Sequence, residues 1–149
     1  MAEYSTTSKD KLLTCHFSIR TLFFEVIKHF DHTVLYGYRT PAEQFELFKR
    51  GRELKNGLWE VVNPLEVVTY CDGRDKMSRH NSNPAEAIDV APYPIDWKDI
   101  KRFYYFAGFV KGLAKQMEIP IIWGGDFDSD NVLNDQTFYD LPHWELKKE

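Results

Sequence analysis

The sequence contains few cysteines, and their positions exclude two common kinds of site. Its 149 residues include only Cys15 and Cys71. Two cysteines cannot form the disulfide framework of a small secreted protein, and neither belongs to a Cys-x-x-Cys pair of the kind that binds metals or exchanges disulfides. We therefore expect two free thiols and a fold that depends on its hydrophobic core.

Long apolar runs and an excess of positive charge are also missing. No segment approaches the roughly 20 apolar residues that cross a bilayer, and the first thirty residues lack the apolar stretch that marks a secretory signal. The net charge is −4, with acidic and basic residues interspersed. A nucleic-acid binder would need a basic stripe. We expect a protein made in a cytoplasm without a signal peptide, with neither membrane insertion nor nucleic-acid binding.

What the sequence does contain is enough apolar material for one folded domain. Hydrophobic residues make up 43% of the chain and aromatic residues 15%, which excludes a disordered protein. The length fits a single domain over residues 1–149, with residues 1–7 expected to fray. Two segments repeat apolar residues at the 3.6-residue spacing of a helix: Ile19, Leu22, Phe23, Val26, Ile27 and Phe30, and later Ile100, Phe103, Tyr104, Ala107, Val110, Ala114 and Met117.

Short β-rich segments alternate with these helices. Residues 33–39, 87–91, 121–123 and 143–146 are predicted strands, and residues 65–70 are a further candidate. Residues 52–64 read as an irregular loop with a turn at Asn56-Gly57, and residues 124–139 as a long loop. We predict an α+β domain, an antiparallel sheet with helices packed on it.

The starts of three helices carry capping signals. Thr40-Pro41-Ala42-Glu43 combines a capping threonine, a proline at the first helical position and a glutamate three residues later. Thr7 or Ser8 is predicted to cap a helix over residues 9–14, and Asp96 to cap the longest helix.

Two polar segments hold the residues that are best suited to bind a metal ion or to transfer protons. His80 lies in a polar loop before the strand that carries Asp89, and His143 begins the last strand, three residues after Asp140. Two imidazoles and a carboxylate can fill three positions of a tetrahedral zinc site and leave the fourth to water. A neighbouring carboxylate can then accept a proton from that water. Spacing alone leaves open a second interpretation, in which these histidines are solvated or hydrogen-bonded structural residues, as we expect for His16, His29 and His32.

A third polar segment contains acidic residues that suggest a calcium site. Asp126, Asp128 and Asp130 occupy alternate positions and could supply hard oxygen ligands. An EF-hand is disfavoured because Asn131 stands where its glycine belongs and Thr137 where its closing glutamate belongs. A looser Ca²⁺ site and a plain acidic loop both remain open.

Four segments, in order from residue 36 to 146, resemble the M15 family of zinc peptidases of the D-alanyl-D-alanine carboxypeptidase type. The closest resemblance is to its phage L-alanyl-D-glutamate endopeptidases, which are endolysins. The segments are Tyr36-Gly37-Tyr38-Arg39-Thr40-Pro41 with Glu43-Gln44, Ser78-Arg79-His80 with Ala87-Ile88-Asp89, Trp123-Gly124-Gly125-Asp126, and Asp140-Leu141-Pro142-His143-Trp144-Glu145.

This resemblance implies roles for individual residues. His80, Asp89 and His143 would bind one Zn²⁺, with the site at the sheet and its loops, and Asp140 would be the general base. Arg39 would stabilise the charge that develops on the substrate carbonyl oxygen. Ser78 would orient a ligand or contact substrate, and Glu145 would either support a ligating histidine or face outward. The spacer between His80 and Asp89 is longer than in many members, which makes Glu86 a rival ligand.

The expected function is therefore zinc-dependent hydrolysis of the peptidoglycan stem peptide, at the L-Ala–D-Glu bond, by a monomeric phage endolysin that reaches the cell wall after release. A D-Ala-D-Ala carboxypeptidase on the same fold is the nearest alternative. A non-catalytic zinc-binding interaction domain is a second. A nuclease that uses Ser78-Arg79-His80-Asn81 is disfavoured by the acidic charge.

Overall fold

The centre of the fold is a four-stranded antiparallel sheet. The structure, a computed structural model, describes residues 2–148. The strand order is β1 (His32–Tyr36), β4 (Ala87–Pro92), β6 (His143–Leu146) and β5 (Ile121–Trp123), and every neighbouring pair is antiparallel. The predicted α+β class and these four strands are confirmed, although β1 ends at Tyr36, beside an irregularity in its pairing with β4.

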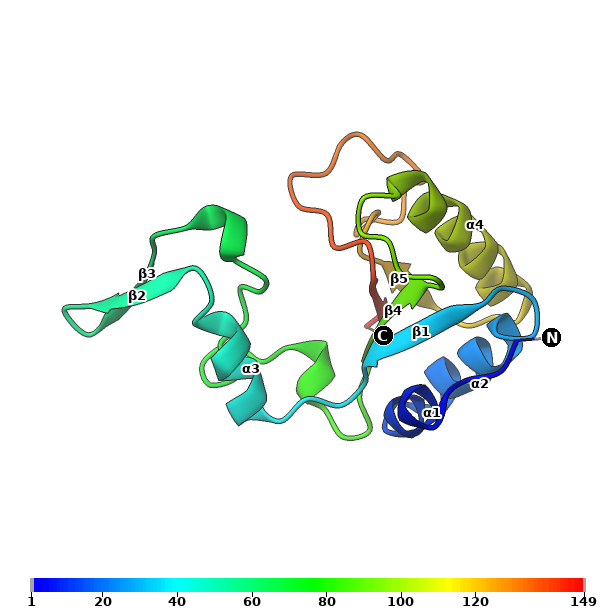
Figure 1. The fold of residues 1–149 in the computed structure, drawn as a ribbon, viewed down its shortest axis with the longest axis horizontal. Helices are drawn as coiled ribbons and strands as arrows, with labels where there is room; N and C mark the ends of the chain where they lie inside the picture. The colour runs from blue at the N-terminus through cyan, green and yellow to red at the C-terminus, as the bar shows by residue number, and fades with distance from the viewer. Residues whose placement is uncertain (1, 149) are drawn as a thin grey trace.

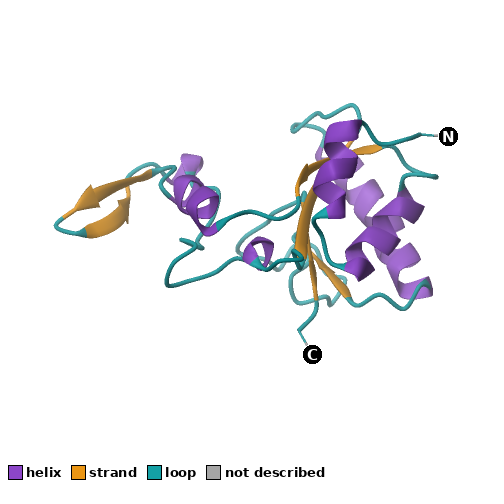
Figure 2. Ribbon diagram, turned by 90° about the horizontal axis from the view of Figure 1, so that it is seen from below, coloured by secondary structure: helices purple, strands orange, loops and turns teal. Residues whose placement is uncertain are grey.

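Three helices cover one face of this sheet (Figures 1 and 2). They are α1 (Thr6–Leu13), α2 (Phe17–Val26) and α4 (Ile100–Gln116). Successive side chains of a strand point to opposite faces, so Ile88 and Val90 of β4 and Trp144 of β6 lie in the core between sheet and helices. The opposite face of β4 carries Asp89 between the small residues Ala87 and Ala91.

The capping residues of two helices differ from the prediction. Ser5, rather than Thr7 or Ser8, caps α1 by accepting a hydrogen bond from the Ser8 amide. Residues 6 and 7, which we expected to fray, therefore form the first turn, while Met1 lies outside the described residues. Asp99 rather than Asp96 caps α4, because the Asp96 carboxylate already accepts from the Lys98 amide in the preceding turn.

A side lobe, residues 41–70, extends from the body of the protein (Figure 1). It begins with α3 (Pro41–Phe48), whose predicted capping box between Thr40 and Glu43 is confirmed. The prediction of an irregular loop over residues 52–64 is wrong. β2 (Arg52–Lys55) and β3 (Leu58–Val61) form a hairpin, because Asn56 and Gly57 both adopt the positive φ that a two-residue hairpin turn requires.

The rest of the lobe has less regular structure than we predicted. Residues 65–70 do not form a strand; the 3₁₀ turn η1 (Pro64–Glu66) leads into an extended segment that returns to the body. Asn63 caps this turn through its side chain, which accepts from the Leu65 amide. A second 3₁₀ turn, η2 (Arg79–Asn81), precedes β4.

Two expectations from composition can be compared with the structure. Cys15 is buried and Cys71 partly buried, and both are free thiols, as predicted. Within residues 2–148, the helices are too short or too polar to cross a membrane.

Candidate metal centre

Two of the predicted ligands face each other across neighbouring strands. Asp89 of β4 is paired in register with His143 of β6. Because Ile88 and Trp144, the next pair, point into the core, Asp89 and His143 must point to the opposite face. The hydrophobic core therefore fixes which face of the sheet carries the two ligands.

The third ligand reaches the sheet from η2. The Ser78 side chain accepts from the His80 amide, and the Asn81 side chain accepts from the Ser78 amide, which closes a small capping box around the turn. His80 Nδ1 donates to the Gly37 carbonyl over 2.8 Å. A side chain at Gly37 would collide with the Lys11 carbonyl and the Thr14 hydroxyl, so glycine is required there.

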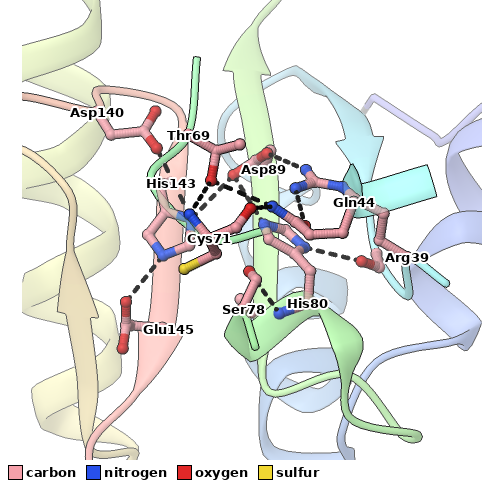
Figure 3. Close-up of polar contacts among 12 residues, drawn as sticks. Arg39, Gln44, Thr69, Cys71, Ser78, His80, Asp89, Asp140, His143 and Glu145 are labelled. Atoms are coloured by element: carbon pink, nitrogen blue, oxygen red, sulfur yellow. Dashed lines mark hydrogen bonds and ion pairs between the residues drawn. The ribbon is translucent and has the colours of Figure 1, made fainter. Parts of the chain in front are cut away.

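The ligand atoms of these three residues converge on one point (Figure 3). Asp89 Oδ1 lies 3.3 Å from His80 Nε2 and 3.1 Å from His143 Nδ1, and all three ligand atoms lie within 4.8 Å of one another. His80 is 2% exposed, and its Nε2 is buried without a hydrogen bond. A buried nitrogen lone pair aimed at a carboxylate and a second imidazole fits a divalent cation with nitrogen and oxygen ligands.

Glu145 orients His143 from the side away from this point. His143 Nε2 donates to Glu145 Oε1 over 2.9 Å, which leaves Nδ1 for the metal. Such outer carboxylates fix the orientation of ligating histidines. Arg79 lies behind Glu145 and forms an ion pair with Glu86 at 3.1 Å. Glu86, the rival ligand, is therefore directed away from the cluster.

The electrostatics of the cluster favour a cation. Burial opposes ionisation of Asp89, but His80 and His143 hold the pKa of its carboxyl well below the usual range. Burial likewise opposes charge on His143, yet hydrogen bonds to Asp89 and Glu145 raise its pKa to about 10. The carboxylates thus create a negative electrostatic potential that a divalent cation would neutralise. A bound cation would also displace the proton from His143.

Asp140 lies at the edge of the cluster, where the predicted base belongs. Its Oδ2 is 4.0 Å from His143 Nδ1. Burial and the nearby charge of Asp89 raise its pKa to about 6, so the carboxyl is ionised at neutral pH. The loop that carries it is held by Gly124, whose carbonyl accepts from the Asp140 amide. A side chain at Gly124 would come within 2.0 Å of the Asp140 carbonyl oxygen.

Arg39 lies against Asp89, one of the three candidate ligands. One guanidinium nitrogen lies 3.3 Å from Asp89 Oδ2, and the other donates to Gln44 Oε1 over 2.8 Å. The side chain is 7% exposed and packs over the Tyr36 ring at 4.5 Å. This geometry orients Asp89, and the predicted contact with a substrate oxygen stays a prediction.

Sequence reasoning missed a hydrogen-bonded support behind Arg39. Gln44 is fully buried and donates to the Thr69 hydroxyl over 3.1 Å and to the Cys71 carbonyl over 3.0 Å. It thereby joins Arg39 to the segment that returns from the side lobe (Figure 3). Gln44 lay inside a segment that resembled the M15 family, but nothing in the sequence marked Thr69 or Cys71.

The cluster opens into a cleft of about 540 Å³. His80, Asp89, Asp140 and His143 line it together with Ser78, so the structure brings all the predicted site residues to one place. Segments from the side lobe, from residues 71–77 and from residues 124–139 form further walls. The cleft also carries basic side chains: Arg39, Arg50, Lys76, Arg79 and Lys148.

The acidic group at Asp126, Asp128 and Asp130 also gathers its carboxylates, with ligand atoms within 4.8 Å of one another. Asp126 is fully buried; one oxygen binds Lys111 Nζ at 2.8 Å and the Asn131 amide, while Oδ1 is buried without a hydrogen bond. Phe127, between the first two acids, lies 6.1 Å from the His143 ring. The acidic loop therefore borders the candidate metal centre.

Comparison with known proteins identifies the fold and the family of this chain. The crystal structure of the Serratia marcescens L-Ala D-Glu endopeptidase ChiX has the same fold: the TM-score is 0.61 at 20% identity, over 97% of this chain and 89% of that one. A 58-residue stretch, 39% of this chain, is 36% identical to part of the chloroplastic/mitochondrial lysine–tRNA ligase of Arabidopsis thaliana, of which it spans 9%. Residues 1–147 match the family described as phage L-alanyl-D-glutamate peptidase. The chain therefore belongs to the phage L-alanyl-D-glutamate peptidase family.

Proposed function

We propose that this protein is a zinc-dependent peptidoglycan endopeptidase that cleaves the stem peptide between L-alanine and D-glutamate. The observation that carries the proposal is the convergence of His80, Asp89 and His143 within 4.8 Å, in a cleft that also holds Asp140. Family membership supports the peptidase activity and the choice of bond. The zinc requirement is supported by the set of ligand atoms, two nitrogens and one oxygen.

In this mechanism the protein groups have distinct tasks. His80, Asp89 and His143 would hold the ion. Zinc, when bound, would supply a Lewis acid for the amide carbonyl and would lower the pKa of water toward about 7. Asp140 accepts a proton as the water oxygen bonds to the alanine carbonyl carbon. It then transfers this proton to the departing nitrogen as the C–N bond breaks. The carboxylic acid formed on alanine passes its remaining proton to the amine of D-glutamate, which gives a carboxylate and an ammonium group.

Arg39 and Ser78 support this chemistry from outside the ligand set. Arg39 holds Asp89 through the buried ion pair, and we propose that any contact it makes with the carbonyl oxygen is secondary to that task. Ser78 shapes the turn that presents His80 and lines the cleft. A substitution of Arg39 should therefore weaken metal binding as well as catalysis.

A digest of purified sacculi tests the proposal. The zinc-loaded enzyme should release muropeptides with new amino termini on D-glutamate, detected by mass spectrometry. Release of D-alanine alone would instead identify a carboxypeptidase. Zinc binding with no cleavage of any stem-peptide bond would identify a non-catalytic zinc domain and reject the proposal.

We propose further that the protein acts as a phage endolysin, as a monomer. On this proposal it is made in the host cytoplasm and reaches the cell wall after release. Family membership supports this role. Sedimentation of the purified protein would test the monomer, and lysis of cells upon exposure of the wall to the enzyme would test the role.

A second cation site is a separate proposal about the acidic loop. We propose that Asp126, Asp128 and Asp130 bind Ca²⁺, because hard oxygen ligands at these spacings suit that ion. The support is the buried, unpaired Oδ1 of Asp126 within the cluster. The ammonium group of Lys111 already neutralises part of the charge, so we expect modest affinity.

A further inference from the structure

A second hollow adjoins the cleft beside Asp140. Its volume is about 320 Å³. Val68, Phe138 and Asp140 line both spaces, so the hollow continues the cleft past the candidate base. We call it the aromatic hollow and define it by Val67, Val68, Trp97, Phe138, Tyr139 and Leu141.

Trp97 gives this hollow a flat and firmly supported wall. Its ring stacks on Phe103, with centroids 5.5 Å apart and planes inclined by 21°. Phe103 is almost completely buried, whereas Trp97 is 55% exposed. A large aromatic ring that is braced from behind and open to a concavity is a typical contact for a ligand with an apolar face.

The charge of the lining changes from the cleft to the hollow. Five basic residues line the cleft. Of these, Arg50 and Lys76 form no ion pair within residues 2–148, whereas Arg39 and Arg79 bind carboxylates. Among the described residues, the aromatic hollow is lined by no basic residue and by one acid, Asp140. The cleft is also lined by Asp89, Asp140 and Glu145, of which Asp89 and Glu145 are paired with Arg39 and Arg79. Arg50 and Lys76 can therefore attract an anionic group to their part of the cleft, and the hollow suits an uncharged group.

The proposed substrate has the same asymmetry about its scissile bond. On the amino side of that bond, the L-alanine nitrogen is acylated by the lactyl group of N-acetylmuramic acid, an uncharged sugar at this position. On the other side, D-glutamate carries a free carboxylate. The alanine and the lactyl group each span about one residue, so the sugar begins about 7 Å from the scissile bond. A sugar subsite next to Asp140 is within that reach.

We propose that the aromatic hollow binds the N-acetylmuramic acid residue that carries the stem peptide, with its pyranose ring against Trp97. This inference rests on the proposed function and deepens it. The C–H groups on one face of a pyranose carry partial positive charge and pack against the negative face of an indole ring. The D-glutamate carboxylate then lies toward the basic residues of the cleft, so the charge pattern sets the direction of the bound chain.

Two matched substrates test the subsite. One is N-acetylmuramyl-L-alanyl-γ-D-glutamyl-L-lysine, and the other is the same tripeptide with an N-acetyl group in place of the muramyl group. We expect the zinc-loaded enzyme to cleave the muramyl substrate with a kcat/KM about tenfold higher, as one aromatic contact can supply. In Trp97→Ala this ratio should fall to about one or two.

Two further variants control for a general effect of removing an exposed aromatic ring and for unfolding of Trp97→Ala. Tyr105→Ala removes an aromatic ring of 74% exposure on α4, outside both spaces, and should keep the tenfold ratio. Trp97→Leu retains an apolar cover over Phe103 without the flat ring, and should lose the ratio even if Trp97→Ala unfolds. Thermal unfolding of each variant verifies that it is folded.

The outcomes separate this inference from the proposed function. Cleavage of both substrates with equal kcat/KM by the unmodified enzyme would overturn the sugar subsite and leave the peptidase intact. A tenfold ratio that survives in folded Trp97→Ala and Trp97→Leu would also overturn it. Failure to cleave either substrate would reject the peptidase, and the subsite with it.

Discussion

Replacement of Gln44 should weaken metal binding although this residue does not contact the metal ligands directly. Its side chain oxygen accepts from Arg39, which in turn pairs with Asp89. Its side chain nitrogen donates to Thr69 and Cys71. Gln44→Leu keeps a similar volume and removes all three hydrogen bonds. Gln44→Glu keeps an acceptor for Arg39 and removes the two donors.

The magnitudes follow from the fully buried position of Gln44. A hydrogen bond to a charged group contributes about 2 kcal/mol and a neutral one about 1 kcal/mol. Gln44→Leu should therefore lower the free energy of unfolding by about 4 kcal/mol, since it leaves the Arg39 guanidinium and the Cys71 carbonyl without these partners. Gln44→Glu should cost about 2 kcal/mol, because only the two neutral bonds are lost.

Zinc affinity distinguishes support of the metal ligands from support of the fold. Loss of an outer partner typically weakens metal binding by about 10–100-fold. We expect this loss in Gln44→Leu, and an affinity within about threefold of the unmodified protein in Gln44→Glu, which still holds Arg39. Competition with a chromophoric chelator measures the affinity, and urea unfolding measures the stability. If folded Gln44→Leu binds zinc as tightly as the unmodified protein, Arg39 does not need Gln44 to orient Asp89.

Three other predictions concern separate parts of the molecule. Asp140→Asn should retain zinc and lower kcat by about 10²–10⁴-fold, measured on the N-acetyl tripeptide; unchanged kcat would exclude Asp140 as the base. His32 is buried, which lowers its pKa from 6.5 to about 4, so its contribution is complete above pH 6.5 and is lost as the pH falls toward 4. Between pH 7.5 and pH 5, the loss of stability measured by urea unfolding should be about 2 kcal/mol greater in the unmodified protein than in His32→Asn. The comparison with the variant is needed because the raised pKa values of His143 and Asp140 act in the opposite direction in both proteins. About 1 mM Ca²⁺ should raise the midpoint of thermal unfolding by about 4 °C, and an equal rise in Asp128→Asn would contradict binding at the acidic loop.

The sequence was most informative where burial follows a local period. Strand β4 was predicted correctly because its apolar residues mark the segment, and β6 because Trp144 and Leu146 alternate with polar neighbours. Alternation also places Asp89 and His143 on the polar faces of their strands. This alternation does not predict that β4 and β6 are neighbours, since strand pairing depends on contacts between residues more than 50 positions apart. The M15 resemblance, rather than periodicity, predicted that the two ligands meet.

The side lobe shows the opposite situation. Both strands of its hairpin are largely exposed on both faces. Neither strand therefore needs the alternation of apolar and polar residues by which a half-buried strand is recognised in a sequence. In α3, the apolar residues Phe45 and Phe48 are only partly buried, whereas Gln44 is fully buried. A polar residue takes this position because Arg39 requires an acceptor there. That requirement arises from tertiary structure and is invisible to a pattern of hydrophobic residues.

The same register that builds the core also brings together two of the three residues of the candidate metal centre. A slip of one residue between β4 and β6 would turn Trp144 out of the core and His143 into it. Trp144 is fully buried against Phe23 and Trp123, and burial of such a side chain contributes about 2–3 kcal/mol. Hydrophobic packing therefore sets Asp89 opposite His143 without help from a metal. His80 is held independently, since its ring donates to Gly37 and its carbonyl accepts from the Arg39 amide. If these three residues bind an ion as we propose, it would meet ligands already in position, so little of its binding energy would be spent on ordering the chain.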